Sequence, residues 1–157
     1  MKQIKLTYTV SVLSWSELPE EAKKTIEATK EASEKAYAPY SHFQVGAAVL
    51  LADGTIVTGN NQENAAYPSG LCAERVAVFS ANSLYPEQPI QILAITAQSQ
   101  GKFQQKPVTP CGSCRQVFLE SENRYGREIE YYFYGTEEIY YVKGTEALLP
   151  LNFAIRM

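Results

Sequence analysis

The chain has 157 residues, of which 45% are hydrophobic and 20% are charged, and we expect residues 1–157 to form a single folded domain. The formal net charge of −3 argues against binding of nucleic acid, because polynucleotide-binding surfaces need clustered Lys and Arg. The sequence contains neither a signal-peptide apolar core nor the roughly 20 apolar residues of a membrane span, so we expect a cytoplasmic protein with no membrane contact.

The first half of the chain predicts a strand, a helix and a hairpin. Residues 3–13 alternate between polar and apolar side chains, which predicts an extra strand within residues 1–13. A helix should follow, with Ser16 as its N-cap and Pro39 ending it. Residues 43–52 and 55–58 then predict two strands joined by a turn at Asp53-Gly54.

The second half continues the alternation of helices and strands. Residues 59–70 are expected to form a loop, and residues 98–109 a second one. Residues 72–83 predict a buried helix and residues 90–97 a buried strand. Residues 111–122 predict a third helix, and late strands are expected at residues 129–134 and 139–142. This order predicts a layered α/β domain in which helices cover a mixed sheet.

The three cysteines of the chain carry the strongest chemical signal. Cys111 and Cys114 have the C-x-x-C spacing that lets two sulfurs reach one ion, and Cys72 lies two residues before Glu74. All three should fall in the first turns of helices, where the helix dipole favours thiolate. Three ligands leave an open fourth position, as in a catalytic zinc site, and Glu74 is expected to carry protons without binding the metal.

Two other interpretations of the cysteines are possible. The C-x-x-C pair is also typical of a redox dithiol, in which case Cys72 would be a small buried hydrophobic residue. A purely structural zinc site would need a fourth ligand, and His42 is the only histidine. Three cysteines cannot all pair within one chain, which favours reduced thiols and a reducing compartment.

Five segments of the chain, in this order, resemble cytidine deaminases of the small, free-nucleoside type within the zinc-dependent cytidine/deoxycytidylate deaminase family. They are residues 37–48, 61–67, 72–75, 110–116 and 148–153. The resemblance implies a three-layer α/β/α fold with a central mixed sheet of about five strands. It also implies one Zn²⁺ per chain and hydrolytic deamination of cytidine and 2′-deoxycytidine, with release of ammonia, in pyrimidine salvage.

The resemblance assigns roles around the expected metal. Cys72, Cys111 and Cys114 would bind zinc, and Glu74 would move protons between water, the pyrimidine N3 and the departing amine. Three thiolates leave a zinc site formally negative, so a nearby cation would compensate. The two candidates are Arg75, which the resemblance places against a ligand sulfur, and Arg115.

The resemblance also implies substrate contacts. Phe43 and Val45 would line the pyrimidine pocket, while Asn61 and Glu63 would bracket the ribose 3′-hydroxyl. A carboxylate at that point repels a 3′-phosphate, which favours free nucleosides. Further contacts are expected from Tyr67, Ala73 and Phe153.

The small members of the family are homotetramers in which an aromatic residue reaches a neighbouring site. Phe153 is the corresponding residue here, with packing inside its own subunit as the alternative. Residues 1–13 are an extension relative to the family. Two other functions are weighed: deamination of a related aminopyrimidine nucleoside such as blasticidin S, and a non-catalytic, zinc-stabilised binding module with a filled fourth zinc position.

Overall fold

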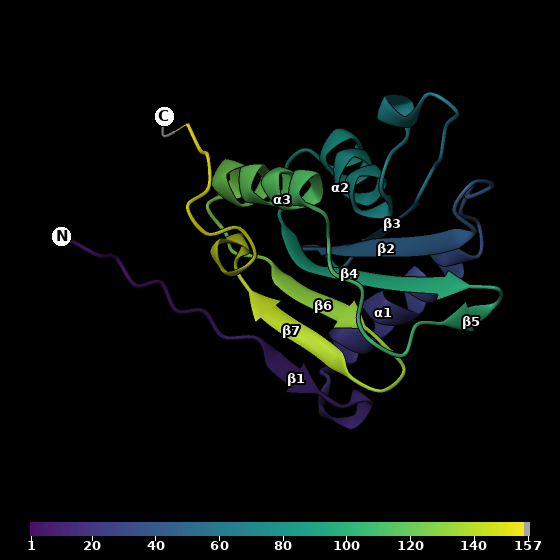
Figure 1. Ribbon diagram of the computed structural model, residues 1–157, viewed down its shortest axis with the longest axis horizontal. Coiled ribbons are helices and arrows are strands. Elements are labelled where there is room, and N and C mark those ends of the chain that lie inside the picture. Colours follow the sequence, from purple (N-terminus) through teal and green to yellow (C-terminus); the bar gives the residue numbers. More distant parts are fainter. Residues whose placement is uncertain (156–157) are drawn as a thin grey trace.

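The centre of the molecule is a seven-stranded mixed sheet with the strand order β1-β7-β6-β4-β2-β3, in which β5 pairs with β4 (Figure 1). The computed structural model describes residues 1–155. Its strands are β1 (Ser11–Leu13), β2 (Phe43–Leu51), β3 (Ile56–Asn60), β4 (Ile90–Ser99), β5 (Lys102–Phe103), β6 (Glu130–Tyr134) and β7 (Ile139–Lys143). Strands β4 and β6 are parallel and all other pairs are antiparallel.

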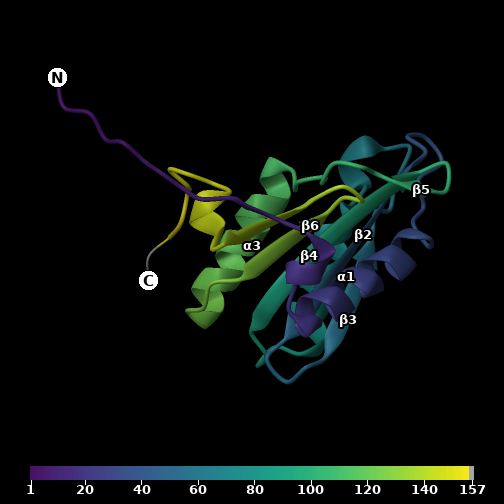
Figure 2. The ribbon, with the colours of Figure 1, turned by 90° about the horizontal axis from the view of Figure 1, so that it is seen from below.

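Three α-helices cover the two faces of the sheet. They are α1 (Glu20–Ser33), α2 (Ala73–Leu84) and α3 (Gly112–Tyr125). Helix α1 packs on one face through a cluster that includes Ile26, and α2 and α3 pack on the other through a larger cluster that includes Phe118 (Figures 1 and 2). The expected three-layer α/β/α arrangement is therefore confirmed. The sheet has seven strands, against the expected number of about five, because two short strands, β1 and β5, add to it.

The structure corrects two expectations at the N-terminal end. The strand expected within residues 1–13 is limited to Ser11–Leu13, because only these residues pair with β7. Ser16 does not cap the long helix. It lies inside a 3₁₀ turn, Trp15–Glu17, whose Glu17 carboxylate accepts hydrogen bonds from the Ser14 N–H and hydroxyl, each at 2.7 Å. Pro19 keeps Leu18 extended, so α1 begins only at Glu20.

Two glycines let helices approach the sheet closely. A Cβ at Gly46 of β2 would overlap the backbone of α1 at Thr29, and a Cβ at Gly59 of β3 would overlap the backbone of α2 at Ala73. The first turn of α2 therefore lies directly against β3, since no side chain separates them. The residue that precedes α2, Cys72, packs against the core cluster that also contains residues of α2 and α3.

The expected hairpin at Asp53-Gly54 is present. Gly54 has a φ of +88°, and the Asp53 carboxylate accepts a hydrogen bond from the Thr55 N–H at 2.9 Å. Within residues 1–155, no helix combines the length and the apolar character that crossing a membrane requires.

Candidate active site

The three cysteines meet where two helices begin. Cys72 is the N-cap residue of α2, Cys111 is the N-cap residue of α3, and Cys114 lies in the first turn of α3. The sulfur atoms of Cys72 and Cys111 are 3.8 Å apart, and those of Cys111 and Cys114 are 3.4 Å apart. Residues separated by 39 positions in the sequence are thus brought together by the packing of α2 beside α3.

The sulfur cluster has dimensions that fit a metal ion. Zn–S bonds of about 2.3 Å in a tetrahedral site separate the sulfurs by about 3.8 Å. All three Sγ atoms lie within 4.8 Å of one another. Across the described part of the chain, this group of potential ligands consists of the three cysteines and does not include His42. The protein therefore supplies three sulfur ligands, and His42 does not complete the site as a fourth ligand.

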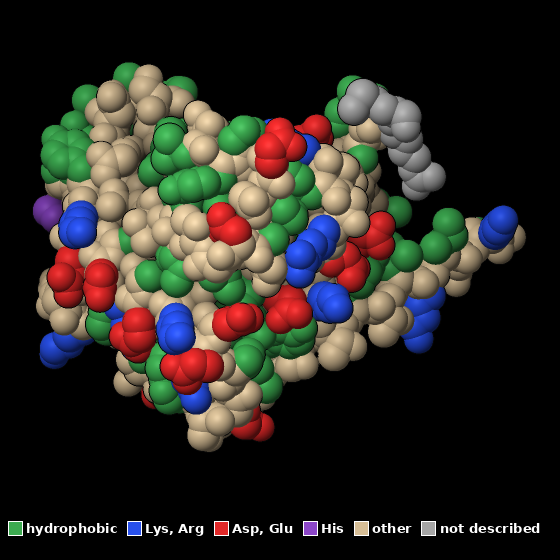
Figure 3. Space-filling view, turned by 180° about the vertical axis from the view of Figure 1, so that it is seen from behind, with side chains coloured by type: hydrophobic (Ala, Val, Ile, Leu, Met, Phe, Trp, Pro, Cys, Tyr) green, Lys and Arg blue, Asp and Glu red, His purple; other side chains and the backbone are tan. Residues whose placement is uncertain are grey.

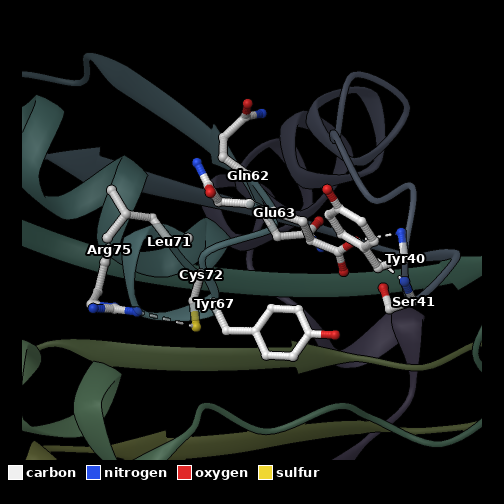
Figure 4. Close-up of a pocket in the computed structure, with 11 residues that line it drawn as sticks. Tyr40, Ser41, Gln62, Glu63, Tyr67, Leu71, Cys72 and Arg75 are labelled. Atoms are coloured by element: carbon white, nitrogen blue, oxygen red, sulfur yellow. Dashed lines mark hydrogen bonds between the residues drawn. The ribbon is translucent and has the colours of Figure 1, made fainter.

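Electrostatic contacts favour a thiolate at Cys72. Its contact with the Cys114 thiol lowers the pKa of Cys72 to about 5, with a further contribution from Arg75, although burial opposes the shift. The Arg75 guanidinium donates to the Cys72 sulfur at 3.7 Å (Figure 4). The pKa of Cys114 is raised, because its thiol proton is shared with Cys72 and because it is buried. A negative sulfur centre beside Arg75 suits a cation.

Glu74 lies beside this cluster with almost no solvent contact. It is the second residue of α2, and 5% of its surface is exposed. Burial raises the pKa of the Glu74 carboxyl above its ordinary value, and the nearby negative charge of Cys72 adds to that shift. A carboxyl group whose protonated form is favoured can both hold and release a proton, which is what general acid–base catalysis requires.

A pocket of about 510 Å³ opens next to Cys72 and Arg75. Its other walls come from the loop before β2, the segment after β3 and the turn before α2, and include Glu63 and Tyr67 (Figure 4). Tyr67 is 78% exposed, and its ring packs edge-on against that of Tyr40 at a centroid distance of 6.4 Å. This volume suits a small molecule that enters from solvent.

Asn61 and Glu63 both lie at the pocket, and both also hold its walls in place. The Asn61 amide donates to the Phe43 carbonyl at 2.9 Å and accepts from the Val45 N–H at 2.8 Å. The Glu63 carboxylate accepts from the Tyr40 N–H at 2.9 Å and the Ser41 N–H at 3.2 Å (Figure 4). The contact with Ser41 lowers the pKa of Glu63, so this carboxylate is ionised.

The sequence analysis did not single out Tyr40 and Ser41, which line the pocket. Both lie within residues 37–48, one of the segments that carry the family resemblance. Their hydrogen bonds to Glu63, however, join residues more than 20 positions apart, so these contacts depend on the fold. Phe43 and Val45 reach the site through Asn61 without lining the pocket, and Ala73 lies buried at the start of α2.

Two expected site residues lie away from the pocket. Arg115 donates to the Pro110 carbonyl at 2.9 Å and to the Leu148 carbonyl at 2.6 Å, so it ties the loop before Cys111 to the C-terminal segment. Within residues 1–155 its side chain makes no hydrogen bond to a sulfur atom. Phe153 is 74% exposed, and its carbonyl accepts from Gln116 at 2.9 Å. Its ring is not part of the pocket of its own chain.

Comparison with known proteins places this geometry in context. Residues 19–125 match the family described as the cytidine and deoxycytidylate deaminase zinc-binding region. A cytidine deaminase from Sporosarcina psychrophila is 48% identical over 100 residues, which cover 64% of this chain and 69% of the relative. A cytidine deaminase from Halalkalibacterium halodurans is 49% identical over 90 residues, which cover 57% and 64%. The matched part thus spans about two thirds of these relatives' lengths.

Solved structures extend the similarity over most of the chain. The crystal structure of a cytidine deaminase from Burkholderia pseudomallei has a TM-score of 0.71 and 37% identity, and the match covers 87% of this chain and all of that one. A cytidine deaminase from Mycobacterium tuberculosis has a TM-score of 0.67 and 34% identity, and covers 85% and 98%.

Proposed function

Because this chain belongs to the cytidine and deoxycytidylate deaminase family, we propose that it is a hydrolase that converts cytidine and water to uridine and ammonia. The single observation that supports this function best is the joint position of three sulfurs, a buried carboxyl and a pocket. Cys72 belongs both to the sulfur cluster and to the pocket wall, and Glu74 is buried two residues further along α2.

We assign Cys72, Cys111 and Cys114 as the ligands of one Zn²⁺ per chain, which their sulfur spacing supports. When bound, zinc supplies a water molecule whose pKa is lowered toward neutrality. Arg75 offsets part of the thiolate charge by its contact with Cys72. The Cys72 sulfur therefore contributes less net negative charge to the pocket than a thiolate without a cationic neighbour would.

In this proposal Glu74 moves every proton of the reaction. Its carboxylate accepts a proton from the water as the water oxygen bonds to C4, and it delivers that proton to N3 of the pyrimidine. Glu74 then accepts the proton of the new C4 hydroxyl and gives it to the amine. The C4–N bond breaks, its electrons leave with the nitrogen, and the C4 carbonyl of uridine forms as ammonia departs. Its raised pKa supports this role, because burial favours the protonated form of the carboxyl group.

The pocket supports a free nucleoside as the substrate. Glu63 is an ionised carboxylate that has one oxygen engaged by backbone N–H groups. It can accept a hydrogen bond from a ribose hydroxyl and would repel a phosphate at the same position. Asn61 retains a second N–H and a second lone pair for the same hydroxyl. We propose that both cytidine and 2′-deoxycytidine are used, in pyrimidine salvage in the cytoplasm.

Incubation of the purified protein with cytidine tests this function, because uridine formation changes the ultraviolet spectrum. We expect turnover of cytidine and 2′-deoxycytidine, and far weaker turnover of cytidine 3′-phosphate and of cytosine in single-stranded DNA. Zinc-loaded protein that turns over neither nucleoside would contradict the proposal and would favour a non-catalytic binding module. Turnover of blasticidin S in preference to cytidine would reassign the substrate.

A further inference from the structure

An arm of exposed apolar residues stands clear of the folded body. This N-terminal arm, residues 1–10, has no helix or strand and extends away from the body in the ribbon views (Figures 1 and 2). A narrow extension also projects from the body in the space-filling view (Figure 3). Four apolar side chains of the arm and that of Val12 in β1 are between 39% and 78% exposed; the four are Ile4, Leu6, Tyr8 and Val10. A contiguous apolar segment of this kind is typical of an interaction site.

The body of the same chain offers the arm little to pair with. Strand β1 joins the sheet through β7, with Ser11 opposite Tyr141. Strand β7 ends at Lys143, and Gly144 turns the chain away with a φ of +77°. Continued pairing would therefore engage only two more arm residues. The other edge of β1 is the outer edge of the sheet and has no neighbour among the described strands.

The apolar residues of the arm form a pattern that is its own mirror image. They are spaced evenly on both sides of Tyr8. If two such segments ran antiparallel with Tyr8 opposite Tyr8, Ile4 would face Val12 and Leu6 would face Val10. This register pairs all five apolar residues on one face, whereas a slip of one residue would oppose apolar and polar side chains.

The polar residues of the arm agree with the same register. Thr7 would face Thr9, a favourable cross-strand pair, and Lys5 would face Ser11. The two copies of Lys5 would then lie about six residues apart along the ladder, so their charges do not meet. The arm contains no acidic residue that would pair with Lys5 in a different register.

The resulting apolar face would continue the core of the molecule. Val12 lies opposite Tyr140 of β7, and Tyr140 packs against the core cluster beneath α2 and α3. Paired arms would therefore extend the same face of the sheet from one copy into the next. Pairing with a second strand covers both the open edge of a strand and its exposed apolar face.

We propose that the N-terminal arms of two copies of this chain pair antiparallel across a two-fold axis at Tyr8, along the free edge of β1. The interface is isologous, because each copy contributes the same segment. It joins two sheets into one and lies apart from the cysteine cluster. The partner is a second copy because the pattern of residues 4–12 complements itself.

Cross-linking of single introduced cysteines tests the register. Tyr8→Cys places two thiols on the axis, within about 5.5 Å between Cα atoms, and Lys5→Cys places them about 20 Å apart. With a short bismaleimide we expect at least about tenfold more covalent dimer from Tyr8→Cys. The wild-type protein, loaded with zinc, measures any contribution of the native cysteines. Equal yields from both variants, or no dimer from Tyr8→Cys, would overturn the proposal.

Hydrogen–deuterium exchange provides a second measurement that needs no new thiol. Amides of residues 4–10, which lie outside the β1–β7 pairing, should exchange about tenfold more slowly than in an unpaired segment. Tyr8→Glu opposes two carboxylates on the axis and should abolish this protection, whereas Lys5→Glu, which is also exposed and would lie opposite Ser11, should retain it. Rapid exchange of the wild-type arm would contradict self-pairing and would indicate an arm that is free or reserved for another protein.

Discussion

At the residue scale, Cys72 connects the sulfur cluster to the pocket. It contacts Cys111 at 3.8 Å and Arg75 at 3.7 Å, and it also lines the pocket wall. A site with three protein ligands has little redundancy, because removing one leaves two. Replacing any one cysteine should therefore weaken zinc binding even where the helices stay folded.

The first prediction concerns metal content. Cys72→Ala should lose most of the zinc that the wild-type protein carries at about one ion per chain, because two thiolates hold the ion weakly. Elemental analysis after dialysis measures this. Tyr67→Phe, another change in the pocket wall that removes no sulfur, should retain its zinc. Full zinc occupancy in Cys72→Ala would show that the ligand set is wrong.

The second prediction separates proton transfer from metal binding. Glu74→Gln keeps the size of this buried side chain but removes its ability to carry a proton. We expect normal zinc content and a normal circular dichroism spectrum, with kcat lower by about 10²–10⁴-fold. Glu17→Gln, on the exposed 3₁₀ turn, is the matched control and should leave kcat unchanged. Near-normal turnover by Glu74→Gln would remove Glu74 from the mechanism.

At the scale of elements, Asn61 joins the end of β3 to the beginning of β2. Its side chain fills one backbone acceptor and one backbone donor of β2, at Phe43 and Val45. Asn61, an expected substrate contact, therefore also holds β2, the strand that carries the expected pyrimidine-binding residues. A purely ligand-binding residue would affect substrate affinity alone, so stability distinguishes the two roles.

The third prediction uses that difference. Asn61→Ala should raise KM for cytidine and also destabilise the fold by about 1–3 kcal/mol, because two half-buried backbone groups lose their partners. In a domain of this size each kcal/mol lowers Tm by roughly 2–4 °C. Gln62→Ala removes only an exposed hydrogen bond to Asn60 and should leave Tm nearly unchanged. A raised KM with an unchanged Tm would rule out the role of Asn61 in holding β2.

At the scale of the whole molecule, one subunit does not bring every expected substrate contact to its own pocket. Phe153 is 74% exposed, and the segment that carries it is tied to α3 through Gln116. Arg115 fixes the start of this segment at Leu148. An exposed aromatic ring on an anchored segment is suited to fill a pocket in a neighbouring subunit.

The fourth prediction follows from this placement. We expect a homotetramer by light scattering, and Phe153→Ala should raise KM, whereas Leu151→Ala, which is 87% exposed two residues earlier, should not. Mixed oligomers test the neighbour directly. Subunits with Glu74→Gln and subunits with Phe153→Ala should together be more active than the sum of each alone, because some hybrid sites regain both groups. A monomer with full activity, or no gain on mixing, would contradict this arrangement.

The sequence by itself determined the parts of this protein that depend on local chemistry. The cysteine spacing, the Asp53-Gly54 turn and the helices that begin near Cys72 and Cys111 follow from interactions between residues close in the chain, and the structure has these elements where they were expected. The family resemblance rests on the same short segments. Ser16 was wrongly expected to cap a helix because Ser14 and Glu17 formed a competing local turn.

Only the tertiary structure decided which distant groups meet. Strand β1 pairs only through Ser11–Leu13, with residues of β7 that lie about 130 positions away in the chain. Asn61 and Glu63 hydrogen-bond to backbone groups of β2 and of the loop before it. Arg115, which was expected near the sulfur cluster, hydrogen-bonds to two carbonyl groups instead. Such contacts depend on which surfaces pack together, and the free energy of packing is shared by the whole core, so no single segment encodes them.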